Sequence, residues 1–166
     1  MTPIKIKRGT IKDKLESSKA LFYEWMMLNE SAAKIPIFKE TDKIIYWALV
    51  ESFCGHLRNF IEFFHRKDKQ PFHIDYLPKG ENISLKHRLD KIYGEKVNDL
   101  LSHCTYKRLN YTIDEQVWDI PQIRNQINEN MLYLIGKADK SLFCKEILEY
   151  ETLIKKKIIL TTILYV

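Results

Sequence analysis

The stretch KIIYWALVESFCGHLRNFIEFFH, residues 43–65, decides the fold of this chain. Its large apolar residues recur at steps of four, three, one and three: Phe53, Leu57, Phe60, Ile61 and Phe64. At about 100° per residue, this spacing places them on one arc of an α-helix, which we expect to face a hydrophobic core. Thr41 or Asp42 can cap the start of the helix. The stretch therefore predicts one long amphipathic helix.

Helical periodicity and capping residues continue on both sides of this stretch. The further helices are expected over about residues 11–29, 85–109, 119–136 and 141–157. Thr10 and Ser84 fit the N-cap positions of the first two, and Pro121 suits the first turn of the third. Gly94 predicts a break or kink inside the second. The chain thus reads as a succession of helices.

Three segments interrupt this pattern. Residues 31–40 contain Pro36 and are predicted to be a connector, and residues 66–82 are predicted to be a loop because they hold prolines and a glycine without a sustained period. Residues 158–166, IILTTILYV, are almost wholly apolar and too short to span a bilayer. We expect this tail to be buried within the domain or against a partner.

Composition favours the same fold class. The 166 residues are 45% hydrophobic in type, which is enough to bury one substantial core. Five Gly and five Pro leave little turn chemistry for the many hairpins of an all-β fold. We therefore expect an all-α fold, a single up-and-down helical bundle of about five helices over residues 1–166. Its core is expected to include Trp25, Trp47 and Trp118.

The remaining composition bears on compartment and ligands. Cys54, Cys104 and Cys144 lie far apart and form no CxxC pair, so we expect neither disulfides nor a zinc site. The five histidines show no metal-ligand spacing and no Gly-rich phosphate loop occurs, so we expect no metal and no cofactor. No apolar run approaches a membrane span or a signal peptide. A cytoplasmic protein without membrane contact is expected.

The chain carries 27 basic and 22 acidic residues, a formal net charge of +5 with a pI near 9.0. This excess is compatible with contact to nucleic acid and does not require it. The basic residues gather near the start, at residues 65–69 and at residues 154–157.

A polar stripe is predicted on the helix over residues 43–65, roughly opposite its apolar arc. Its members are Glu51, Arg58, Glu62 and His65. Arg58 and His65 are two turns, or about 10.5 Å of axial rise, apart. One phosphate can contact both only if the helix end frays or a second subunit contributes. In the alternative interpretation the stripe is a solvated face on which Glu62 pairs with Arg58 and Arg66.

The segment ALVESFCGHLRNFIEFFH resembles the motif helix of the HEPN superfamily, in which an Arg and a polar residue precede a His by four to six intervening positions. Arg58, Asn59 and His65 match these three positions. VESFCGHLRNFIEFF, followed some forty residues later by LLSHCTYKRL, is similar to a prokaryotic HEPN branch related to abortive-infection proteins. The resemblance covers about residues 43–110.

The resemblance implies a small helical bundle that pairs two-fold and brings both motif helices to a shared cleft. Active members are metal-independent ribonucleases in which the His moves a proton while the Arg and the polar residue hold the scissile phosphate. An imidazole suits this role because its ordinary pKa is about 6.5, and a guanidinium binds phosphate through two parallel hydrogen bonds. The implied site is catalytic Arg58, Asn59 and His65, supported by Glu51, Glu62 and His103.

Two other histidines have competing interpretations. His103 lies in the second matching segment near two basic residues and is a rival catalytic candidate, or else a surface residue bound to Asp99. His56 lies on the flank of the motif helix near Ser52 and Asn59, where we expect a structural polar contact. Adjacent residues on a helix diverge by about 100°, so Cys104 and His103 cannot form a nucleophile and base pair, and we expect Cys104 in the core.

Two functions follow. The first is an RNA-cleaving or RNA-binding HEPN-like homodimer of toxin or host-defence type, with RNA and an antitoxin protein as partners. The second is a non-catalytic helical module that dimerises through the apolar tail or the motif helix. Convergence of Arg58 and His65 across a two-fold axis would favour the first. Arg58 held by Glu51 or Glu62, with His65 facing solvent, would favour the second.

Overall fold

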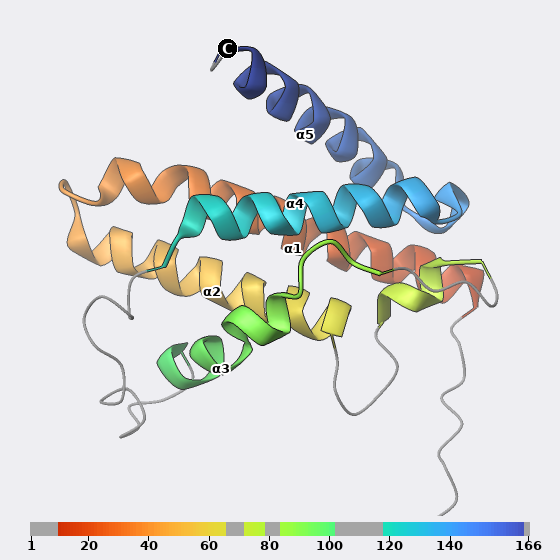
Figure 1. The fold of residues 1–166 in the computed structure, drawn as a ribbon, viewed down its shortest axis with the longest axis horizontal. Helices are drawn as coiled ribbons and strands as arrows, with labels where there is room; N and C mark the ends of the chain where they lie inside the picture. Colours follow the sequence, from red (N-terminus) through yellow and green to blue (C-terminus); the bar gives the residue numbers. More distant parts are fainter. Residues whose placement is uncertain (1–9, 66–71, 79–83, 102–117, 165–166) are drawn as a thin grey trace, which may run out of the picture.

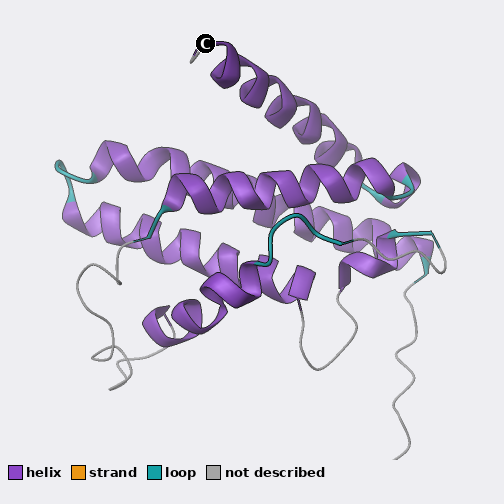
Figure 2. Cartoon of the chain, viewed as in Figure 1, coloured by secondary structure: helices purple, strands orange, loops and turns teal. Residues whose placement is uncertain are grey.

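The computed structural model describes residues 10–65, 72–78, 84–101 and 118–164, and within them the chain is helical without any strand (Figure 2). The elements are α1 (Ile11–Phe38), α2 (Lys43–His65), the 3₁₀ helix η1 (Phe72–Tyr76), α3 (Leu89–Leu101), α4 (Ile120–Lys137), the 3₁₀ helix η3 (Lys140–Leu142) and α5 (Lys145–Leu164). The expected all-α helical bundle is confirmed. Helix α1 packs against α2, α4 and the first part of α5, α3 packs across α2, and the C-terminal part of α5 extends away from the other helices (Figure 1).

The helix starts follow from their capping residues. Thr10 and Asp13 form a reciprocal capping box at the start of α1, with the Thr10 N–H donating to an Asp13 carboxylate oxygen at 2.8 Å. Asp42 Oδ1 accepts two backbone N–H groups at the start of α2, each at 3.0 Å. Asp119 accepts from the Gln122 N–H at the start of α4. These short-range signals were sufficient to predict where the three helices begin.

The predicted connector over residues 31–40 is wrong. Helix α1 continues to Phe38 and contains Pro36 within its last turn. Ala32 and Ile35 are buried in the core on this part of the helix. Their burial favours the helical conformation, which offsets the backbone hydrogen bond that Pro36 cannot donate.

The predicted core face of α2 is confirmed. Phe53 and Leu57 are fully buried, Phe60 and Phe64 are 1% exposed, and Ile61 is half-buried against the same cluster. Burial of four such side chains, each worth roughly 1.5–3 kcal/mol, makes this face a main source of the bundle's stability.

Helices α1 and α4 are joined by a buried polar bridge. Trp25 Nε1 donates to Asn128 Oδ1 at 2.7 Å, and the Asn29 and Asn128 side-chain amides donate to each other at 3.0 Å. The bonds satisfy polar atoms that lie inside the core, where an unpaired donor or acceptor would be costly. Because these bonds have one geometry, they fix the register of α1 against α4.

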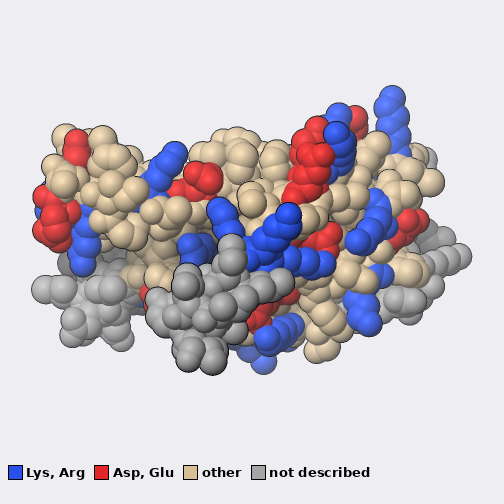
Figure 3. All heavy atoms as spheres, turned by 90° about the horizontal axis from the view of Figure 1, so that it is seen from above, with Lys and Arg blue, Asp and Glu red and all other residues tan. Residues whose placement is uncertain are grey.

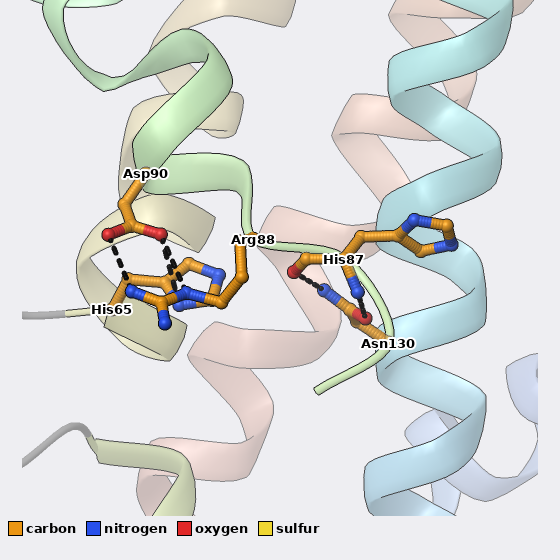
Figure 4. A network of polar contacts seen from close by, with 5 residues as sticks. All are labelled: His65, His87, Arg88, Asp90 and Asn130. Carbon is orange, nitrogen blue, oxygen red and sulfur yellow. Dashed lines mark hydrogen bonds and ion pairs between the residues drawn. The ribbon is translucent and has the colours of Figure 1, made fainter. Parts of the chain in front are cut away.

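Helix α3 begins later than predicted and is not broken at Gly94. It starts at Leu89 rather than at Leu85. The Asn130 side chain of α4 accepts from the His87 N–H at 3.1 Å and donates to the His87 carbonyl at 3.0 Å, so the backbone of His87 is paired with a side chain and is not part of a helix (Figure 4). Local sequence patterns could not predict these two hydrogen bonds, because Asn130 lies 43 residues after His87.

Two further predictions are corrected in part. The loop expected over residues 66–82 holds the short helix η1, in which Tyr76 is buried and stacks on Phe143 at 4.9 Å between ring centroids. The last helix begins at Lys145, after η3, and runs through the expected tail to Leu164. The side chains of residues 158–164 lie outside the description, so burial of the apolar tail stays a prediction.

Candidate functional site on helix α2

The polar stripe of α2 is exposed at three of its four predicted members. Glu51, Arg58 and Glu62 are all exposed. Arg58 Nε lies 3.5 Å from Glu62 Oε1, and the two side chains keep 48% and 61% of their accessible surface. This pair has the spacing of the solvated-face interpretation. An ion pair this exposed contributes little to stability.

The prediction that His65 belongs to the exposed polar stripe is wrong, because the structure buries its side chain. Its side chain is 4% exposed and its Nδ1 lies 3.5 Å from Asp90 Oδ1, at the start of α3 (Figure 4). Helix α3 covers the end of α2 on this side, and helical periodicity alone could not show that. His65 therefore does not share the solvent-facing stripe with Arg58, and it does not face solvent as the non-catalytic interpretation required. In this position its side chain has almost no contact with solvent.

Arg88 holds the carboxylate that faces His65. Arg88 Nε and Nη2 donate to the two oxygens of Asp90 at 3.1 and 3.0 Å. Burial alone would raise the pKa of Asp90, but the Arg88 hydrogen bond and the nearby His65 and Arg88 charges leave that pKa below its usual value. The two Arg88 hydrogen bonds hold Asp90 as a charged acceptor beside the buried ring of His65.

His65 and His73 are a pair of buried histidines beneath this contact. The ring nitrogen Nε2 of His65 and both ring nitrogens of His73 are buried without a hydrogen-bond partner. Burial lowers the pKa of His65 to about 4, against a smaller raising effect of Asp90, and burial also lowers the pKa of His73. Both rings contact Phe64. They behave as neutral core residues at neutral pH.

His56 makes a structural polar contact, as its position on the flank of the motif helix predicted. Its Nδ1 lies 2.6 Å from Glu24 Oε2 of α1, and Asn59 Nδ2 donates to the same oxygen at 2.9 Å. The side chains of His56 and Glu24 are 13% and 25% exposed. A structural contact near Asn59 was predicted, but Glu24 was missed because it lies 32 residues away on another helix. The i,i+3 spacing of His56 and Asn59 was the available signal that both face one neighbour.

A third histidine–carboxylate pair joins His87, which precedes α3, to Glu129 of α4. His87 Nε2 is 2.9 Å from Glu129 Oε2, and Lys86 contacts the same oxygen. The hydrogen bonds from Lys86 and His87 lower the pKa of Glu129. This carboxylate is thus shared between a lysine and a histidine, on a different helix from Arg58.

The start of α2 carries large apolar side chains that face solvent. Ile44 is 83% exposed and Trp47 is 59% exposed, so the expectation that Trp47 lies in the core is wrong. Trp25 is fully buried as expected, and Trp118 is half-buried with the Lys96 ammonium 4.5 Å from its ring centroid. Helical spacing puts Ile44 and Trp47 in line with Glu51 and Arg58. The exposed face of α2 therefore has an apolar first half and a charged second half.

Several predictions fall outside the described residues. They concern His103, Cys104 and the segment LLSHCTYKRL beyond Leu101. Cys54 and Cys144 are free and buried. Within the ranges that the structure describes, no cluster of three or more metal-ligating side chains occurs. In the same ranges, no helix has the length and apolar character needed to cross a bilayer.

The basic excess of the chain is not gathered on the face drawn in Figure 3. Lys and Arg side chains are interspersed there with Asp and Glu. Many of the basic side chains have an acidic neighbour on the same helix, as in the pairs Lys34–Glu30 and Lys145–Glu149. The net charge of the chain therefore does not predict that this face binds a polyanion such as RNA.

No protein-family model, curated protein or solved structure matches this chain. The resemblance to the HEPN superfamily therefore stays a prediction that depends on the motif of Arg58, Asn59 and His65 and on the later segment LLSHCTYKRL.

Proposed function

We propose that this protein is a homodimeric, RNA-binding relative of the HEPN superfamily in which α2 provides both the subunit contact and the phosphate contact. The observation that supports this proposal is the uncovered face of α2, which leads from Ile44 and Trp47 to Arg58. A toxin or host-defence role, with an antitoxin protein as a second partner, comes from the resemblance alone.

The apolar first half of this face is suited to a two-fold contact. Exposed Ile and Trp side chains this close together are costly in water, and buried aromatic anchors dominate many protein interfaces. In a two-fold pair each copy offers the same patch to the other, so Trp47 and Ile44 would be covered by their own symmetry mates. Ile37, at the end of α1, is 63% exposed and would enlarge the patch.

The charged second half would stay open beside that contact. Arg58 lies eleven residues after Trp47, or about 16 Å along the helix axis. A guanidinium binds a phosphate through two parallel hydrogen bonds. The exposed Asn59 follows Arg58 in the chain, and its amide nitrogen donates to Glu24 of α1. Binding would therefore depend on Arg58 and weaken with added salt.

The test is RNA binding by the purified protein at low and high salt, measured by fluorescence anisotropy with a labelled single-stranded RNA. We expect Arg58→Ala to weaken binding about tenfold or more, since a charged hydrogen bond is worth roughly 1.5–3 kcal/mol. Lys34→Ala is the matched control because Lys34 and Glu30 form an exposed i,i+4 pair on α1. Equal effects of both variants, or no binding at low salt, would refute RNA recognition by Arg58.

A non-catalytic dimerisation module is the second candidate. It is favoured by the contact between Arg58 and Glu62 and by the exposed Trp47. Analytical ultracentrifugation of the wild type and of Trp47→Glu tests the shared interface, and we expect the variant to be monomeric. A dimer that binds no RNA would leave this second candidate, and a wild-type monomer would refute the interface in both.

A further inference from the structure

We infer that His65 and His73 form an acid-operated latch that holds α3 on α2, and that protonation of the two rings releases α3 before the rest of the bundle unfolds. The two histidines lie where three elements meet, at the end of α2, in η1 and beside the start of α3. The change takes place inside one chain, and it depends neither on RNA binding nor on the proposed function.

The latch is a cluster of two buried rings. Both side chains are buried, and both rings contact Phe64. The ring of His73 also lies against Phe63, at 6.3 Å between ring centroids. His65 Nε2 and both ring nitrogens of His73 form no hydrogen bond within the part of the chain that the structure describes. The two rings therefore pack as neutral, largely apolar groups.

A carboxylate that is already paired faces His65. Asp90 Oδ1 lies 3.5 Å from His65 Nδ1, while Arg88 donates two hydrogen bonds to the same carboxylate (Figure 4). Burial lowers the pKa of His65, and the positive charges of Arg88 and His73 lower it further. The Asp90 charge and the His87 carbonyl group raise this pKa without cancelling the effect of burial. A proton on His65 is thus costly as long as α3 stays in place.

The surroundings of His73 disfavour a proton as well. Burial lowers its pKa, and the Phe63 carbonyl group opposes this effect without reversing it. Asp75, the acidic residue of η1, acts on the neighbouring Tyr76, where burial and the Asp75 charge both raise the pKa. Protonation of both histidines places two positive charges in one aromatic cluster, which is unfavourable until the rings reach water. The rings reach water when α3 and η1 separate from α2.

Helix α3 covers the side of α2 that carries His65 and Cys54. These two residues are eleven positions apart, which on a helix returns to within about 20° of the same direction. Cys54 is fully buried; burial raises the pKa of its thiol to about 12, and the charge of Lys96 on α3 opposes this rise. Release of α3 therefore uncovers Cys54. Cys144 is buried elsewhere, between η3 and α5, where its N–H donates to Ser18 Oγ of α1 at 2.7 Å.

The direction of the pH effect follows from the lowered pKa values. A released His65 takes up its proton near its ordinary pKa of 6.5, whereas the latched ring does so only near about 4. The latch is therefore fully held above about pH 7 and is lost as the pH falls toward 4. From these two values, the ratio of released to latched α3 rises about 20-fold between pH 7 and pH 5. His73 adds to this factor because burial lowers its pKa too.

The experiment measures how fast a dipyridyl disulfide, which reacts with thiols in acid as well as at neutral pH, labels Cys54 and Cys144. Mass spectrometry quantifies each site at pH 7 and pH 5, and each rate is divided by the rate in urea-unfolded protein at the same pH. We expect the relative rate at Cys54 to rise about 20-fold or more and to exceed that at Cys144 at both pH values. Low concentrations of urea should hardly change the Cys54 rate, because release of one helix exposes less surface than unfolding.

Variants connect this opening to the latch. The double variant His65→Gln with His73→Gln should label Cys54 at the same relative rate at pH 7 and pH 5, because glutamine does not titrate. His56→Gln, which changes the α1–α2 contact, is the matched control and should keep the wild-type pH dependence. Equal relative rates at Cys54 and Cys144 in the wild type, or a full pH dependence in the double variant, would overturn the latch.

A second measurement covers the case in which the double variant does not fold. Hydrogen exchange of the wild type, corrected for the intrinsic rates at each pH, compares peptides from α3 and α4. We expect α3 to lose protection at pH 5 well before α4 does. Equal loss of protection in both helices would show global unfolding and would refute a separate release of α3.

Discussion

The burial of His65 predicts that this protein loses stability in mild acid. A group whose folded pKa lies below its unfolded value takes up its proton more readily in the unfolded chain. Unfolded His65 therefore binds a proton as the pH falls through its ordinary value of 6.5, whereas folded His65 does so only near about 4. Stability is full above about pH 7 and declines as the pH falls from 6.5 toward 4.

The magnitude follows from the same two pKa values. At roughly 1.4 kcal/mol per pKa unit, the whole difference corresponds to about 3 kcal/mol. Between pH 7 and pH 5 the expected loss from His65 is about 2 kcal/mol. His73 adds to the loss because its pKa is also lowered by burial. Asp90 acts in a separate window below about pH 4, since its lowered pKa makes its contribution disappear only when it is protonated.

Urea unfolding followed by circular dichroism at pH 7, 6 and 5 measures this dependence. We expect His65→Gln to start less stable at pH 7 but to lose about 2 kcal/mol less than the wild type on going to pH 5, because glutamine does not titrate. The double variant with His73→Gln should be flatter still. An NMR titration that places the His65 pKa near 6.5, or a His65→Gln variant with the wild-type pH dependence, would refute the reasoning.

Two further predictions concern the core. Asn128→Ala should lower the free energy of unfolding by about 2–4 kcal/mol, because it leaves the buried Trp25 side-chain N–H and the Asn29 side-chain oxygen without their partner. Urea unfolding checks this against Asn125→Ala, an exposed change on the same helix that should have little effect. Leu57→Ala should lower the free energy of unfolding by about 2–5 kcal/mol, because Leu57 is fully buried. Leu153→Ala, at a 45% exposed position, should lower it far less. Similar losses in both variants would contradict the assigned core face.

Part of the candidate site could be predicted from the sequence. Helical spacing was enough to place Glu51, Arg58 and Glu62 on an exposed stripe, since residues seven apart on one helix share a side. The same spacing placed His65 there as well, and this was wrong because α3 covers the end of α2. The partner of His56 could not be found, because Glu24 comes from α1 and no local rule relates positions 32 apart.

The sequence alone determined the elements that depend on near neighbours. The bounds of α2, its buried face and the capped starts of α1 and α4 follow from spacing of three or four residues and from side chains that bond the next turn. The tertiary structure decided what depends on distant groups. Helix α3 starts later than predicted because Asn130 bonds the backbone of His87. Helix α1 continues past Pro36 because residues around it are buried in the core. His65 is buried and neutral because α3 packs over the end of α2. These outcomes depend on which helices meet, and a periodic pattern shows that a face will be covered without showing what covers it.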